Sequence, residues 1–206
     1  MYINCNKLIY ISQKAGGGAI FAGSESRTNI TYSSFTNNSA ENGGAIYNHG
    51  DLDNNGLGGN MTIKDSTFTG NTAGKAGGAI YNNGAITFSG TVNFEGNTAG
   101  NVKNDIYNDG IINIAAGATV NFDGGIDADT TTAGSVLNIG DGATLGLRLT
   151  SAADYTQIKS YEINYLGTTN LNLTIGAVGT YNVFDSEKDT YAGDILPTIM
   201  ANPLYD

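Results

Sequence analysis

Two short motifs, Gly-Gly-Ala-Ile and Phe-x-x-Asn, recur along this chain at intervals far longer than a heptad or a β-hairpin. The first motif occurs at residues 17–20, 43–46 and 77–80. The second begins at Phe35, Phe68 and Phe94. A repeat of roughly 20–50 residues is typical of stacked units that bury their apolar faces against their neighbours. The spacing of the isoleucines, 26 or 34 residues, therefore predicts a solenoid and favours a structural or binding role over catalysis.

Apolar and polar residues alternate over short stretches between these motifs. The alternating positions are Ile30/Tyr32, Met61/Ile63, Ile86/Phe88 and Ile112/Ile114, and then Ser33/Phe35, Ser66/Phe68, Val92/Phe94 and Val120/Phe122. Alternation with period two indicates half-buried strands. Three short strands in about 25 residues, with glycines that each penalise a helix by ~1 kcal/mol, leave no room for a helix. The sequence therefore predicts an all-β fold, a parallel β-helix of about six to seven coils and roughly 30 Å in length.

The repeated residues have physical roles in such a stack. Ile46, Ile80 and the Ile106 of a decayed fourth motif are predicted to form one inward column, and the motif phenylalanines another. The paired glycines allow turns that are closed to other residues and let adjacent coils approach. The asparagine that ends each Phe-x-x-Asn is predicted to adopt a left-handed turn conformation. Its side chain is predicted to bond to the equivalent asparagine one coil away.

The pattern continues beyond the motifs. Residues 112–122 match residues 137–147, and a fainter echo lies at residues 173–183. We therefore expect a parallel β-helix repeat region over residues 1–150. Residues 151–206 are expected to form irregular coils, or a transition region, that continue the solenoid. Because neither end of the pattern has an obvious polar cap, we expect an open-ended fragment of a longer solenoid.

Charge and composition exclude several classes of partner. The net charge is −10, and only nine Lys and Arg are present, with no cluster in the sequence. A nucleic-acid binder needs a cationic stripe, and an anionic lipid surface would repel this chain. No apolar run approaches the ~20 residues of a membrane span, so we expect no direct membrane insertion of this segment. Cys5 is the sole cysteine, which excludes an intrachain disulfide.

Together, Gly-Gly-Ala-Ile and Phe-x-x-Asn resemble the repeat signature of the chlamydial polymorphic membrane proteins. They are also similar to coils of other bacterial autotransporter passengers, over about residues 16–125. The resemblance implies a right-handed parallel β-helix that is exported and displayed on the bacterial cell surface, associated with the outer membrane, often in adhesion. It implies further passenger coils and a barrel outside this chain. It supplies no catalytic residues and no cofactor.

The resulting hypothesis is a non-catalytic, adhesin-like stalk that presents a repetitive polar surface. Its expected partners are host or bacterial surface glycans or proteins, bound weakly and multivalently. An ice-binding solenoid is a further possibility, but it needs a flat and regular threonine array. The threonines at positions 31, 62, 87, 91 and 119 are not expected to share one register.

The alternative is a β-helical polysaccharide lyase or hydrolase. Such an enzyme needs an Asp cluster with an Arg or Lys base, or two carboxylates that face the scissile bond. The two arginines, Arg27 and Arg148, lie near no recurring acidic position. His49, the only histidine, could be a general base, but its place in the repeat is that of an exposed turn residue. The sequence therefore predicts no catalytic residue.

One segment has the pattern of a metal site. Asp51-Leu-Asp53-Asn-Asn55-Gly fits the start of a Ca²⁺ loop, in which alternate oxygens converge and glycine allows a sharp turn. The segment lies in the stretch that lengthens one repeat to 34 residues. The twelfth loop position is Thr62, where a bidentate Glu is expected. Asp51, Asp53 and Asn55 are therefore a weak Ca²⁺ candidate, with a plain Asx-rich turn as the alternative.

Overall fold

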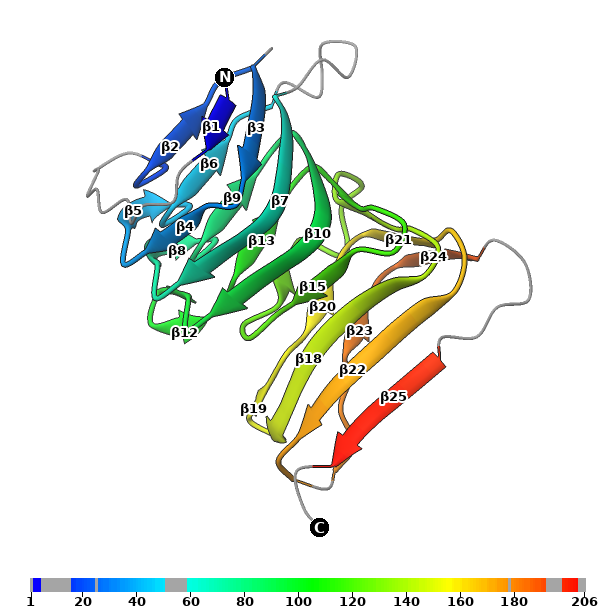
Figure 1. Ribbon diagram of the computed structural model, residues 1–206. Coiled ribbons are helices and arrows are strands. Elements are labelled where there is room, and N and C mark those ends of the chain that lie inside the picture. Colours follow the sequence, from blue (N-terminus) through cyan, green and yellow to red (C-terminus); the bar gives the residue numbers. More distant parts are fainter. Residues whose placement is uncertain are drawn as a thin grey trace.

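The fold is a β-solenoid of about six turns (Figure 1). The computed structural model describes residues 2–4, 16–24, 26–50, 59–177, 179–191 and 198–203. Every regular element in these ranges is a strand, and equivalent strands of successive coils pair in parallel. The predicted parallel β-helix is confirmed. Within the described residues there is no helix that could cross a membrane.

Three sheets form the walls of the solenoid, and the fourteen-stranded sheet makes up two of these walls. The seven-stranded sheet consists of β2 (Ile20–Ala22), β6 (Ile46–Asn48), β9 (Ile80–Asn82), β13 (Ile106–Asn108), β16 (Ile126–Asp127), β20 (Ile158–Lys159) and β23 (Phe184–Asp185). The four-stranded sheet consists of β5 (Ser39–Asn42), β8 (Thr72–Ala76), β11 (Thr98–Ala99) and β12 (Val102–Lys103). The fourteen-stranded sheet consists of β1 (Tyr2–Asn4), β3 (Arg27–Thr31), β4 (Ser34–Thr36), β7 (Asn60–Thr69), β10 (Ala85–Glu95), β14 (Ile111–Ile114), β15 (Thr119–Asn121), β17 (Val136–Ile139), β18 (Ala143–Ser151), β19 (Asp154–Tyr155), β21 (Glu162–Tyr165), β22 (Thr169–Ile175), β24 (Lys188–Tyr191) and β25 (Thr198–Pro203).

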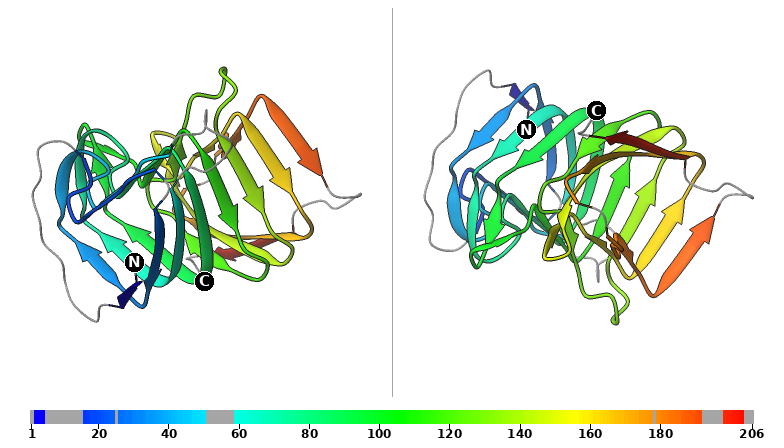
Figure 2. Two further views of the ribbon diagram at one scale, coloured as in Figure 1. Left: turned by 90° about the horizontal axis from the view of Figure 1, so that it is seen from above. Right: turned by 90° about the horizontal axis from the view of Figure 1, so that it is seen from below.

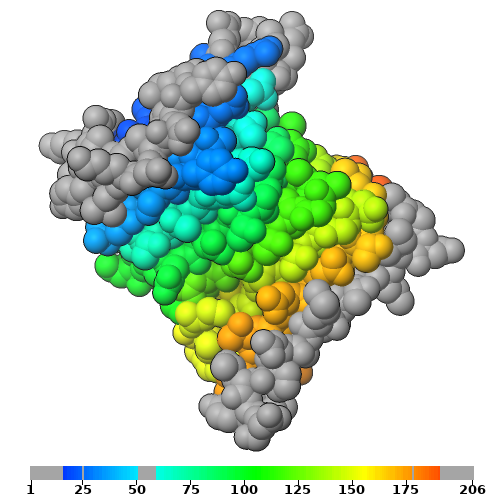
Figure 3. Space-filling view, viewed as in Figure 1, coloured from blue at the N-terminus to red at the C-terminus, as the bar shows by residue number. Residues whose placement is uncertain are grey.

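Successive coils lie side by side along one axis. In the space-filling view the colours form parallel bands from blue through green to orange, one coil after another (Figure 3). The views from above and below show the same order of strands (Figure 2). The long strands β7 and β10 belong to two walls, because the first half of β10 pairs with β14 and its second half with β15.

The predicted apolar columns are confirmed. Ile46, Ile80 and Ile106 are in register and fully buried. This column extends in both directions along the seven-stranded sheet, through Ile20, Ile126, Ile158 and Phe184. The phenylalanine rings stack with centroid separations of 4.9, 5.0 and 5.5 Å, in the order Phe35, Phe68, Phe94, Phe122. Burial of each such side chain contributes roughly 1.5–3 kcal/mol.

The predicted asparagine ladder is confirmed, but its predicted backbone conformation is wrong. Asn38 Nδ2 donates to Asn71 Oδ1 at 2.9 Å, and Asn71 Nδ2 donates to Asn97 Oδ1 at 3.0 Å. The left-handed residue is the one before each asparagine, namely Asn37, Gly70 and Gly96. The preceding residue makes the turn, so that the ladder asparagine points inward. A second ladder joins Asn48, Asn82 and Asn108 with amide hydrogen bonds of 2.8 Å.

The two glycines of each Gly-Gly-Ala-Ile have the two predicted roles. The first adopts a left-handed conformation, with φ of 58° at Gly43 and 67° at Gly77. The second allows close packing of coils, because a Cβ on Gly44 would overlap the carbonyl oxygen of Gly78. The two requirements explain why the pair recurs as a unit.

One predicted strand alignment is wrong by two residues. The pattern equated Ile30/Tyr32 with Met61/Ile63, whereas Ile30 pairs with Ile63 and Thr28 pairs with Met61. Tyr32 lies at the corner between two walls, with φ of 48° and 59% of its surface exposed. Because its side chain is aromatic, Tyr32 fits the alternation pattern of an inward-facing residue, although it lies at a corner.

Beyond the motifs, one predicted match is confirmed and one is wrong. Ile112 pairs with Leu137, as predicted. The echo at residues 173–183 is out of register, because Leu137 pairs with Ile163 and Leu173 pairs with Leu147. Parallel pairing continues through β20, β21, β22 and β25, and the domain boundary near residue 150 stays a prediction.

As expected, the five threonines do not share one register. Thr62 pairs with Thr87, and Thr91 pairs with Thr119 in a different row. Thr31 pairs with Lys64 instead. The row of Thr62 and Thr87 passes into an asparagine row whose amides bond to one another, formed by Asn113, Asn138 and Asn164. The outer face is therefore a mixed Thr/Asn surface.

Candidate binding groove

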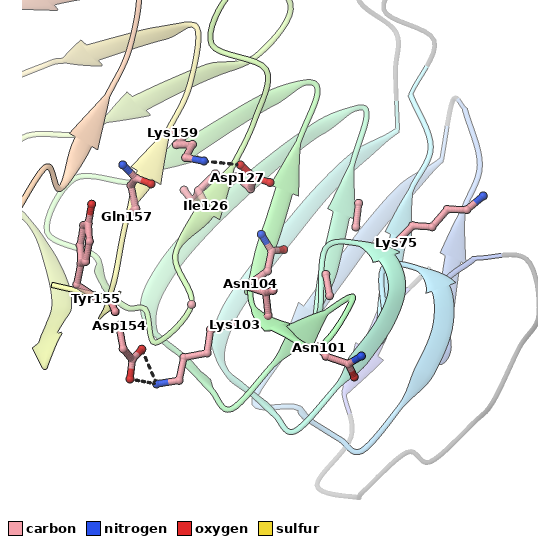
Figure 4. Close-up of a pocket in the computed structure, with 15 residues that line it drawn as sticks. Lys75, Asn101, Lys103, Asn104, Ile126, Asp127, Asp154, Tyr155, Gln157 and Lys159 are labelled. Atoms are coloured by element: carbon pink, nitrogen blue, oxygen red, sulfur yellow. Dashed lines mark hydrogen bonds and ion pairs between the residues drawn. The ribbon is translucent and has the colours of Figure 1, made fainter. Parts of the chain in front are cut away.

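A groove of about 730 Å³ opens on the side of the solenoid where the four-stranded sheet ends (Figure 4). This sheet ends at β12, whereas the other two sheets continue along the axis. The side chains that line the groove include Lys103, Asn104, Asp127, Tyr155, Gln157 and Lys159. We call this feature the side groove.

Two short antiparallel strands border the side groove. β12 turns back on β11 through Gly100 and Asn101, whose φ values of 55° and 66° are those of a tight hairpin turn. β19 turns back on β18 and carries Asp154 and Tyr155. An edge strand as short as β12, which has two residues, is one way in which a sheet avoids a long open edge. The side groove is thus a consequence of how this wall ends.

An ion-pair network joins the two borders. Lys103 Nζ lies 3.3 Å from Asp123 Oδ1 and 3.1 Å from Asp154 Oδ1. An Arg148 guanidinium nitrogen lies 2.6 Å from Asp123 Oδ1. The hydrogen bond from Lys103 lowers the pKa of Asp154. Partly exposed pairs contribute little stability singly, so the main effect of the network is to fix the positions of these side chains.

The cations that are scattered in the sequence come together in space. Lys75, Lys103 and Lys159 all line the side groove, and Arg148 joins its network. Each has a carboxylate partner: Lys159 lies 3.2 Å from Asp127 (Figure 4), and Lys75 pairs with Glu41. The absence of a cationic cluster therefore holds for the sequence but not for the fold, in which every one of these four charges is balanced.

A buried carboxylate lies directly behind the side groove. Asp105 replaces the alanine of Gly-Gly-Ala-Ile and continues the asparagine ladder, because Asn97 Nδ2 donates to its Oδ1 at 3.0 Å. Its Oδ2 accepts the backbone N–H groups of Asp123, Gly124 and Gly125 at 2.7–2.9 Å. Asp105 thereby holds the loop that carries Asp123.

Two opposing effects act on the ionisation of Asp105. Burial, with a smaller contribution from the charge of Asp123, raises its pKa to about 6. Hydrogen bonds from Asn97 and from the N–H groups of Gly125 and Gly124 oppose the rise. The carboxylate is therefore charged at neutral pH and close to titration at mildly acidic pH.

Asp51, Asp53, Asn55 and Cys5 lie outside the described residues, so the Ca²⁺ site that the sequence suggested stays a prediction. Thr62 lies in β7, paired with Thr87. Among the described residues, no three His, Cys, Asp or Glu side chains are placed to hold a metal ion.

His49 is exposed, and it contacts aromatic rings on the seven-stranded wall. Its ring centroid lies 6.1 Å from that of Phe21 and 6.0 Å from that of Tyr47. It does not line the side groove.

Sequence reasoning missed the side groove because its residues each occur once and come from different coils. A signal was nevertheless present. The repeat breaks at residues 104–107, where Gly-Gly-Ala-Ile decays, and again at Phe122, which lacks its asparagine. Asn104 of the first break lines the side groove, and Asp105 bonds to the loop after Phe122, which carries the lining residue Gly124. Breaks in a repeat are therefore positions at which to look for a site.

Comparison with known families agrees with this architecture. The solenoid and its repeats fit a surface-exposed passenger of a bacterial autotransporter. Residues 32–49 and 65–83 match the Chlamydia polymorphic membrane protein repeat, and each segment contains one Phe-x-x-Asn and one Gly-Gly-Ala-Ile. The chain therefore carries this repeat, as the resemblance predicted. The repeat family is a non-enzymatic family of outer-membrane surface proteins. No curated protein and no solved structure matches the chain.

Proposed function

We propose that this chain is part of an adhesin-like passenger on a bacterial surface and that it binds surface glycans or proteins without catalysis. The observation that carries the proposal is the side groove, a recess lined by charged, amide, aliphatic and aromatic side chains on the outer wall of a solenoid that contains the surface-protein repeat. The interior supports this assignment, because it is filled by side-chain columns and leaves the outer surface for binding.

Weak single contacts suit such a role. A solenoid on a cell surface is present in many copies, and the effective concentration of a second site raises avidity without any new contact. The acidic net charge of −10 disfavours anionic surfaces and leaves neutral or cationic groups as the better targets.

An attachment assay tests the proposal. Beads coated with the folded chain are applied to cultured epithelial cells, and bound beads are counted against beads coated with the heat-denatured chain. We expect more attachment with the folded chain, a steep dependence on coating density, and competition by excess soluble chain. Equal attachment of the two bead types would contradict an adhesive role.

The ion-pair network gives a specific reason to test the enzymatic alternative. Asp123, Asp154, Arg148 and Lys103 place carboxylates beside possible bases, a combination that lyases use. Here Asp123 is buried, and both cations form ion pairs with carboxylates. This arrangement supports a positioning role better than proton abstraction.

Product release distinguishes the two functions. The chain is incubated with pectin, alginate or chondroitin-type glycans, with and without Ca²⁺, and unsaturated or reducing ends are measured. We expect none above buffer. Reproducible release that disappears in Asp154→Asn would support the enzyme instead.

A further inference from the structure

The side groove has a composition that specifies its ligand more narrowly than the proposed adhesive role requires. We infer that it binds an uncharged oligosaccharide, with sugar hydroxyls on its polar side chains and one sugar ring against Tyr155. This inference rests on the proposed function and names the ligand class of the same site.

Charge balance is the first argument. Lys103 and Arg148 share Asp123 and Asp154, Lys159 pairs with Asp127, and Lys75 pairs with Glu41. A sulfated or carboxylated glycan needs cations that are free to form new ion pairs, and each of these is already neutralised. The whole chain, at −10, would also repel a polyanion. An uncharged ligand meets neither obstacle.

The arrangement of donors and acceptors is the second argument. Asp127 and Lys159 lie next to each other on one side of the side groove, and Asp154 and Lys103 on another (Figure 4). A sugar hydroxyl both donates and accepts, so it can bond to a carboxylate and an ammonium at once. Because each ion pair already restrains both of its side chains, little side-chain entropy is lost when a ligand binds.

The third argument is the aromatic wall. Tyr155 is half-buried, and its ring packs edge-on against Tyr181 with a centroid separation of 5.4 Å. The hydroxyl of Tyr181 donates to the carbonyl of Ala177 at 2.9 Å, which fixes the supporting ring. An amphipathic aromatic ring of fixed orientation suits the apolar C–H face of a sugar ring. Gln157 lies beside Tyr155 and adds an amide to the same wall (Figure 4).

Size and strand geometry favour a glycan over a peptide. A volume of about 730 Å³ is within the usual range of ligand sites and accommodates several sugar units. A peptide would most readily bind by adding a strand to an exposed sheet edge. The edge strand here, β12, has only two residues, and its Lys103 side chain is held by Asp123 and Asp154.

Amide-shift titration of the intact chain tests the inference. The neutral probes are cellohexaose, chitohexaose, maltohexaose and mannohexaose, and the charged probes are an oligogalacturonate and a heparin hexasaccharide. We expect saturable shifts at residues that line the side groove with at least one neutral probe, with half-saturation at about 1 mM, and none with the charged probes.

Three variants locate the site. Tyr155→Ala removes the aromatic wall and should weaken binding about tenfold. Ala153→Arg fills the side groove from an exposed position and removes no packing, so it should abolish binding even if Tyr155→Ala proves unstable. Tyr32→Ala is the matched control, an exposed tyrosine outside the side groove, and should bind like the native chain.

The outcomes separate this inference from the adhesive role. Shifts with charged probes alone, no shift with any probe, or unchanged binding by Ala153→Arg would overturn the neutral-glycan assignment. Cell attachment that persists in Ala153→Arg would leave adhesion intact and place it elsewhere on the solenoid. Neutral-glycan binding without cell attachment would retain the side groove as a glycan site and contradict the adhesive role.

Discussion

Single residues stabilise this solenoid because each inward side chain packs against its own equivalent one coil away. The isoleucine column of the seven-stranded sheet joins coil to coil through in-register neighbours on both sides. The outward row of the same strands also stacks, with Tyr47 and Tyr81 rings 4.8 Å apart, but it stays partly exposed. The inward isoleucine column is therefore buried away from water, whereas the outward tyrosine column is only partly removed from it.

Replacement of Ile80 by alanine should lower the free energy of unfolding by about 2–5 kcal/mol, because it leaves a cavity in the middle of a fully buried column. Tyr47→Ala should cost less, because Tyr47 faces outward. Urea denaturation of both variants measures the difference. Equal losses would contradict the assignment of the two sides of the strand.

Asp105 is predicted to resist replacement by asparagine, although asparagine occupies the rest of its ladder. Both carboxylate oxygens accept, one from Asn97 and the other from three backbone N–H groups. In either orientation of an asparagine side chain, its NH₂ group would point at a hydrogen-bond donor. Asp105→Asn should therefore destabilise the chain at pH 7. Asn71→Asp is the matched reverse exchange in the same ladder. A neutral or stabilising effect of Asp105→Asn would contradict this account of the anchor.

The pH dependence of stability provides a separate test of Asp105. Its pKa is about 6 in the folded chain and near the ordinary value of 3.8 when unfolded. Because the folded state binds the proton more tightly, this group adds stability as the pH falls from 7 through 6 toward 4. The full effect is of the order of 3 kcal/mol. The difference between native chain and Asp105→Asn, measured by urea denaturation across this range, should show it. Parallel pH curves would refute the shift.

Strands and turns are stabilised by close backbone contact as well as by side chains. Gly44→Ala should be severely destabilising, at the upper end of ~1–3 kcal/mol or beyond, since its Cβ would overlap backbone atoms of Gly78 and Thr72. Gly74→Ala is the control, because its Cβ would make only ordinary contacts at 3.7 Å or more and its φ is not left-handed. Thermal unfolding of both variants measures the effect. Similar melting temperatures would show that coils can separate without cost.

The fold was more predictable than the site, for physical reasons. Columns repeat the same residue type in the same environment, so the positions of Ile80 and Phe68 followed from spacing alone. The corner positions vary in sequence. Tyr32, Asp65 and Gly90 are three different residue types, although all three adopt the same left-handed backbone conformation. The side groove depends on residues that occur once and meet across several coils, and no periodicity can reveal such contacts.

The whole molecule combines continuous walls with one wall that stops. Two sheets run along the length of the described solenoid, whereas the four-stranded sheet ends at β12 and leaves the side groove beside it (Figure 1). In a solenoid each coil contacts only its neighbours, so a local change in one wall need not disturb the rest. The fold thus accommodates a recess without loss of its core.

Exposure on the intact bacterium tests the central claim most directly. An antibody against the folded chain is applied to live, unpermeabilised cells of the source organism, before and after brief treatment with an external protease. The account predicts labelling of intact cells that the protease removes, while an antibody against a cytoplasmic protein gives no signal. Labelling that appears only after the cells are permeabilised would contradict a surface-exposed passenger.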